Sequence, residues 1–118
     1  MRTEASRIGR AMVIKLLEPR LGADTAALFK REVSKHLEAG ETHIVLDLAE
    51  LTFMDSSGLG ALVGVLKMVG ARGDLLVAGT QDRVQTLFRL THMDSVFRCY
   101  ATVPEAIDAL TPSGLYRS

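Results

Sequence analysis

Residues 41–69, ETHIVLDLAELTFMDSSGLGALVGVLKMV, combine three local patterns. Residues 43–48 (HIVLDL) are a short apolar run broken only by Asp47, which is typical of a strand buried on both faces. From Leu59 onward, apolar residues recur every three or four positions, the period of a helix face. The polar turn Asp55-Ser56-Ser57-Gly58 lies between the two. The sequence therefore predicts a strand, a turn and a helix whose unpaired amides face solvent at its start.

Three glycines fall within the predicted helix, at Gly58, Gly60 and Gly64. Each costs up to about 1 kcal/mol relative to alanine in a helix interior, so each needs a structural reason. One explanation is a close approach of the helix to the sheet. The other is access, because a position without a side chain leaves the preceding hydroxyl open to a partner. Both explanations are consistent with the sequence.

The rest of the chain alternates strand and helix patterns. Strands are predicted at residues 11–17, 74–78 and 96–100. Helices are predicted from Asp24 or Thr25 to Glu38, from about residue 80 to 90, and from Pro104 to Leu110. Their apolar faces are Ala27, Leu28, Val33 and Leu37 in the first of these helices, and Val84, Leu87, Phe88 and Leu90 in the second. Alternation of this kind implies right-handed crossovers and a mainly parallel sheet.

We therefore predict an α/β fold with a four- to five-stranded, mainly parallel sheet packed with about four helices. Residues 1–10 form either an antiparallel edge strand, turned by Gly9-Arg10, or a loose arm. Residues 111–118 are expected to be a flexible tail. A chain of 118 residues suits one domain with a single core, here spanning about residues 11–110.

Composition narrows the possible functions. Fourteen basic and fourteen acidic residues cancel, so no overall field favours nucleic acid or an anionic membrane. No apolar run is long enough to span a bilayer. The single cysteine, Cys99, excludes an internal disulfide and is expected to pack as a small hydrophobe. These features favour a cytoplasmic location.

The sequence motifs give little support to a catalytic function. Ser56 is not in a G-x-S-x-G elbow, and a hydrolase would need His36, His43 or His92 as its base. His43 begins the predicted strand, at the end opposite to Ser56. We therefore expect no enzyme activity and no catalytic residue.

Cofactor and metal sites are not expected either. Gly58, Gly60 and Gly64 give GxGxxxG, one residue longer than a dinucleotide fingerprint and placed inside the helix pattern rather than ahead of it. The acids Asp47, Glu50 and Asp55 could hold a hard cation, but acids near a helix start are also favoured by its dipole. A hydroxyl at this position can instead accept a phosphoryl group, which changes the charge of the surface without refolding the domain.

The segment Phe53-Met54-Asp55-Ser56-Ser57-Gly58-Leu59-Gly60, following HIVLDLAEL, resembles the signature of bacterial anti-sigma factor antagonists, the single-domain STAS proteins. The resemblance extends from about Ala11 to Leu110. It implies that a serine kinase of the histidine-kinase-like ATPase class, often itself the anti-sigma factor, phosphorylates Ser56. The unmodified antagonist binds this kinase, the phosphorylated form is released, and a metal-dependent serine phosphatase resets the cycle. No direct nucleic-acid partner is implied, and a monomer or weak dimer is expected.

The resemblance places partner binding on Asp55, Ser56, Ser57, Gly58, Leu59 and Gly60. Asp55 would shape the acceptor turn, and Ser57 would cap the helix. The chain departs from relatives at residues 18–24 (EPRLGAD), where they often carry Gly-Glu-Leu/Ile-Asp and where Arg20 borders the partner surface. Two alternatives stay open. One is a constitutive interaction subunit, for example of a lipid-transport complex, that docks without phosphorylation; the other is a small enzyme or nucleotide-binding module.

Overall fold

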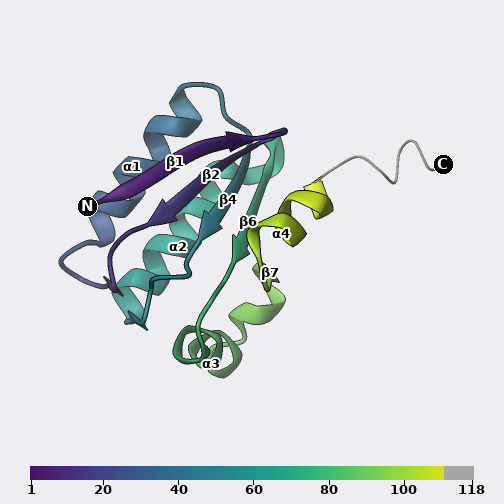
Figure 1. The fold of residues 1–118 in the computed structure, drawn as a ribbon. Coiled ribbons are helices and arrows are strands. Elements are labelled where there is room, and N and C mark those ends of the chain that lie inside the picture. Colours follow the sequence, from purple (N-terminus) through teal and green to yellow (C-terminus); the bar gives the residue numbers. More distant parts are fainter. Residues whose placement is uncertain (111–118) are drawn as a thin grey trace.

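Strands and helices alternate along the chain, and the central strands of the sheet run parallel to one another (Figure 1). The computed structural model describes residues 1–110. The main sheet has the strand order β1-β2-β4-β6-β7, which are Thr3–Ile8, Ala11–Leu16, His43–Asp47, Asp74–Ala78 and Arg98–Tyr100. β1 is antiparallel to β2, and the other neighbouring pairs are parallel. The predicted α/β fold is confirmed.

The helices cover the two faces of this sheet unequally. They are α1 (Ala26–Glu38), α2 (Ser56–Val69), α3 (Asp82–Leu90) and α4 (Val103–Leu110), with short 3₁₀ helices η1 (Gly70–Arg72) and η2 (Met93–Ser95). Residues of α1, α2 and α3 share one apolar cluster, whereas α4 packs on the opposite face (Figure 1). Because β4 is covered on both sides, Ile44, Val45 and Leu46 are fully buried. This burial explains their continuous apolar run.

The N-terminal residues are an edge strand rather than a loose arm. Thr3 pairs with Leu16 and Ile8 with Ala11, in continuous antiparallel register. Gly9 takes a φ of +60° in the turn between the two strands, a conformation that glycine adopts without steric cost. The antiparallel alternative for residues 1–10 is therefore the one observed.

A second, two-stranded sheet was not predicted from the sequence. β3 (Arg20–Leu21) lies parallel to β5 (Phe53–Met54). The carbonyl oxygen of Pro19 accepts hydrogen bonds from the amide of Thr52 at 2.8 Å and from its hydroxyl at 3.0 Å. This small sheet ties the segment before α1 to the segment before α2, so the two loops form one surface.

Several helix faces differ from the prediction. In α1 the buried residues are Phe29 and Val33, whereas Leu28 is 38% exposed and Ala27 is also exposed. Val33 and Leu37 contact the core as predicted, whereas Phe29 takes the place predicted for Ala27 and Leu28.

In α3, Val84 and Phe88 are buried as predicted, but Leu90 is 75% exposed. Leu90 follows Phe88 by two positions, which places it on the far side of the helix. The strand predicted at residues 96–100 begins only at Arg98, because Val96 ends η2. The predicted flexible tail, residues 111–118, lies outside the described residues.

Candidate functional site

Asp55 immediately precedes α2 and caps it. Its backbone is extended (φ −104°, ψ −173°), and its Oδ1 accepts a hydrogen bond from the amide of Gly58 at 3.0 Å. The side chain thus satisfies one of the amide donors that a helix start leaves unpaired. The capping role predicted for Ser57 is wrong, because Ser57 is the second residue of the helix and its side chain is exposed.

The carboxylate of Asp55 is held in its charged form. Its pKa is lowered, chiefly by the amide of Gly58 and further by the amides of Ala23 and Ser57, with a smaller contribution from the charge of Arg20; partial desolvation opposes them. Hydrogen bonds to a carboxylate favour its ionised form. A fixed negative charge therefore stands immediately before Ser56.

Two glycines allow this turn to close. A Cβ on Gly22 would lie 2.7 Å from Asp55 Oδ2, so only glycine leaves room for the carboxylate beside the loop before α1. A Cβ on Gly58 would overlap the carbonyl oxygen of Leu21, which accepts a hydrogen bond from the Asp55 amide at 3.3 Å. The close-approach explanation therefore holds for Gly58, although the approach is to β3 rather than to the main sheet.

Gly60 and Gly64 have different surroundings. A Cβ on Gly60 would meet nothing within 4 Å, and the residue is exposed. This openness agrees with the access explanation. At Gly64 a Cβ would lie 3.2 Å from Cε of Lys30, so this glycine makes room for a side chain of α1. Leu59, also predicted to bind the partner, is half-buried and packs against the core.

Ser56 is the first residue of α2 and its side chain is exposed. Within residues 1–110 its hydroxyl takes part in no hydrogen bond. Ser57 is exposed beside it, which gives two neighbouring hydroxyls on the first helical turn. The Ser56 hydroxyl is therefore available for chemistry by another protein, and the fold does not use it.

Two further residues lie beside this turn. Arg20 is directly opposite Phe53 in the β3–β5 pair, and its guanidinium carbon lies 5.1 Å from the centre of the Phe53 ring. Both side chains are exposed, Phe53 at 37%. Sequence reasoning missed Phe53 as a surface residue because it precedes the buried Met54 in an apolar-looking pair.

Other sequence candidates lie elsewhere or have structural roles. His43 is at the start of β4, with Nδ1 3.1 Å from Asp74 Oδ2, at the opposite edge of the sheet from Ser56. Glu50 lies 3.4 Å from Lys15 Nζ, and Asp47 Oδ1 accepts a hydrogen bond from the Ala49 amide. No group of three or more metal-ligating side chains forms among the described residues.

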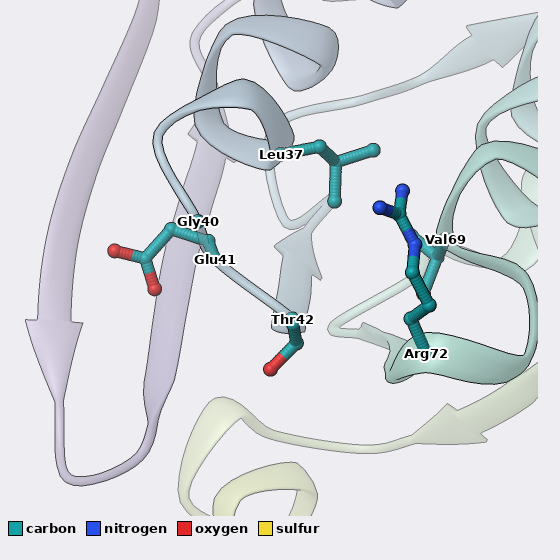
Figure 2. A pocket seen from close by; sticks show the side chains of 6 residues that line it. All are labelled: Leu37, Gly40, Glu41, Thr42, Val69 and Arg72. Carbon is teal, nitrogen blue, oxygen red and sulfur yellow. The ribbon is translucent and has the colours of Figure 1, made fainter.

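A small cavity lies at the other end of α2 (Figure 2). Its volume is about 80 Å³, well below the roughly 300 Å³ at which ligand pockets begin. In Figure 2 Leu37, Val69 and Arg72 face one another across it, whereas the Glu41 side chain points away toward β1, where it pairs with Arg7. The cavity is separated from Ser56 by the length of α2, about 20 Å, and is not part of the acceptor surface.

Cys99 lies on β7 at the edge of the main sheet and is exposed. The prediction that it packs as a buried hydrophobe is therefore wrong. None of the helices within residues 1–110 has both the length and the apolar character needed to cross a membrane.

Comparison with known proteins gives the family. Residues 2–106 match the model of the STAS domain. The anti-sigma F factor antagonist of Paenibacillus polymyxa is 30% identical over 104 residues, which cover 86% of each chain.

Two solved structures share the fold at lower identity. An anti-sigma factor antagonist from Mycobacterium paratuberculosis has a TM-score of 0.83 at 20% identity over 92% of each chain. The phosphorylated form of SpoIIAA from Bacillus has a TM-score of 0.69 at 24% identity, over 92% of this chain and 99% of that one. The chain therefore belongs to the STAS domain family, among the anti-sigma factor antagonists.

Proposed function

We propose that this protein is a non-enzymatic switch that binds an anti-sigma factor with serine kinase activity and is released when Ser56 is phosphorylated. One observation carries the proposal. The Ser56 hydroxyl is exposed on the first turn of α2, beside the fixed charge of Asp55, and takes part in no hydrogen bond within residues 1–110. In this scheme a metal-dependent serine phosphatase restores the unmodified form.

The position suits a reversible charge. A phosphoryl group adds close to two negative charges, and the unpaired amides and dipole at a helix start tolerate them. Because the hydroxyl has no internal partner among the described residues, its modification removes no hydrogen bond from the fold. The scaffold therefore stays intact, whereas the charge of the surface around Ser56 and Gly60 changes sharply.

The names of the relatives support an anti-sigma factor as the partner and phosphorylation as the modification. The Paenibacillus polymyxa protein is named an anti-sigma F factor antagonist, and SpoIIAA, which shares the fold, has been solved in phosphorylated and unphosphorylated forms. For this chain we infer an anti-sigma factor as the partner, and we propose that this partner is a kinase of the histidine-kinase-like ATPase class. The proposed place of action is the cytoplasm, because such a kinase depends on ATP.

Intact mass spectrometry tests the proposal. The chain is incubated with ATP and each kinase of this class encoded in the same genome, and a mass increase of one phosphate is expected. Ser56→Ala abolishes the increase, whereas Ser57→Ala keeps it, because both serines are exposed on the same turn but only Ser56 is the proposed acceptor. Absence of phosphate with every kinase refutes the switch and favours the alternative, a subunit that docks without modification.

A separate titration addresses the nucleotide-binding alternative. NAD(P) or GTP is added to the chain while binding is followed by calorimetry. No saturable binding is expected, since the glycines of α2 serve close packing and an open surface rather than a phosphate-binding turn. Saturable binding that Gly60→Ala removes would support the nucleotide-binding module instead.

A further inference from the structure

Arg20 has a contact that is weak and easily exchanged. Its guanidinium lies over the Phe53 ring, in a pair set by the direct register of β3 and β5. A cation over an aromatic face gains little where both groups are exposed to water. Among the described residues Arg20 forms no ion pair. The guanidinium can therefore exchange its contact with the ring for a stronger one with a nearby anion.

Such a partner would appear at Ser56, only three residues after Phe53. Phe53 and Asp55 lie in the extended segment that leads into α2, and Leu21, the neighbour of Arg20, accepts the hydrogen bond of the Asp55 amide. The charge of Arg20 also contributes to lowering the pKa of Asp55. Its field thus reaches the residue immediately before Ser56. The Asp55 carboxylate is itself engaged by the Gly58 amide.

We propose that Arg20 binds the phosphate of phosphorylated Ser56 and leaves the Phe53 ring when it does so. The guanidinium presents a planar fork of donors that matches phosphate oxygens, and charge-assisted bonds of this kind are stronger than a solvated contact with a ring. This inference rests on the proposed function, because it concerns the phosphorylated form. Besides the new charge at Ser56, phosphorylation would then also move Arg20 away from the Phe53 ring.

The unmodified surface offers a cation stacked on an exposed aromatic ring. In the phosphorylated form the cation is withdrawn toward Ser56 and the ring is bare. A partner that recognises the arginine-covered surface loses this contact as well as meeting new negative charge. Residue 20 thus couples the modification to the neighbouring strand pair.

Phosphorus NMR of a chain with phosphoserine incorporated at position 56 during translation tests the inference without any kinase. The second pKa of the phosphate is measured by titration in the native and Arg20→Gln chains; a nearby cation favours the dianion, whereas the fixed charge of Asp55, present in both chains, opposes it. Arg20→Gln should shift this pKa upward. Arg72→Gln, the same change in η1 beyond the far end of α2, should leave it unchanged. An equal pKa in the native and Arg20→Gln chains overturns the inference.

Proton and nitrogen NMR of the side chains gives a second readout. In the native chain, phosphorylation should shift the Arg20 Nε–H and Phe53 ring signals, and Arg20→Lys should retain only part of the effect because it keeps the charge without the fork. Ring signals of Phe53 that do not respond to the phosphate contradict the release of the ring. Amide spectra of each variant report folding. Since the phosphate is built in, failure of these tests leaves the kinase experiment unaffected, and failure of that experiment leaves these tests unaffected.

Discussion

The backbone carbonyl of Leu21 lies against Gly58, in the position where any other residue would place its Cβ. A loop that precedes α1 is thereby packed onto the first turn of α2. The acceptor turn and the segment around Arg20 are held together by this contact and by the β3–β5 pair. The surface around Ser56 is therefore a property of two chain segments that are far apart in sequence.

The first prediction follows from this contact. Gly58→Ala should lower the free energy of unfolding by about 1–3 kcal/mol, the usual cost of overpacking, because the new methyl group displaces the backbone of β3. Gly60→Ala is the matched control in the same helix. It should raise the free energy of unfolding by up to about 1 kcal/mol, since nothing lies within 4 Å of the added methyl. Urea denaturation measures both, and equal effects would contradict the close-approach role of Gly58.

Charge at the acceptor position should control partner binding. Ser56→Asp should weaken binding to the kinase by about 2 kcal/mol, or roughly thirtyfold in Kd, because it places a carboxylate where the interface excludes water. Ser56→Ala should bind like the native chain. Calorimetry with the purified kinase measures both affinities. Ser57→Asp should have a smaller effect, and equal affinities of the Ser56→Asp and Ser56→Ala variants would count against the proposed mechanism.

The Asp55 carboxylate should contribute to stability in a pH-dependent way. Its pKa is lowered in the folded state, first by the Gly58 amide, so its contribution is present above the unfolded pKa, about 3.9, and is lost as the pH falls through the lower folded value. Asp55→Asn should therefore be less stable than the native chain at pH 7, and the difference should shrink in acid. Thermal unfolding between pH 7 and 3 measures it. A difference that stays constant down to pH 3 would contradict this contribution.

Cys99 should react with a thiol reagent in the folded protein, but slowly. Cys99 is exposed, so a thiol reagent reaches it without unfolding. Partial burial of the thiol group raises its pKa, and the charge of Asp94 adds to this, so a smaller fraction is reactive thiolate near pH 7. Modification should therefore be slower than that of a free thiol and should accelerate with pH. Asp94→Asn should increase the rate, and a thiol that reacts only in denaturant would contradict the exposed placement.

Periodicity was sufficient to predict the elements that contribute most to the core. The run at residues 43–48 and the helix pattern from Leu59 onward correspond to β4 and α2, because burial on two faces and on one stripe leave different spacings. The same reasoning was half right for α1: Val33 and Leu37 contact the core as predicted, whereas Phe29 rather than Ala27 or Leu28 extends their four-residue repeat. Counting the longer stripe would have found the correct face.

The site was only partly predictable. The exposure of Ser56 follows from a local pattern, since a polar turn precedes the helix. The cap by Asp55 was assigned to Ser57 because several polar residues stand together and only backbone angles decide which of them begins the helix. The β3–β5 pair has two residues in each strand, too few to leave any period. The resemblance placed the segment around Arg20 beside the partner surface, but the pairing of Arg20 with Phe53 became visible only in three dimensions.

The outward position of the Ser56 hydroxyl has a consequence for how long a phosphate would persist on the protein. A phosphate there would be attached by a covalent bond to a residue that no core contact depends on, so a chain that unfolded and refolded would carry the same mark afterwards. Thermal unfolding does not remove such a phosphate. Its lifetime is set by the enzyme that removes it and not by the stability of the domain that bears it.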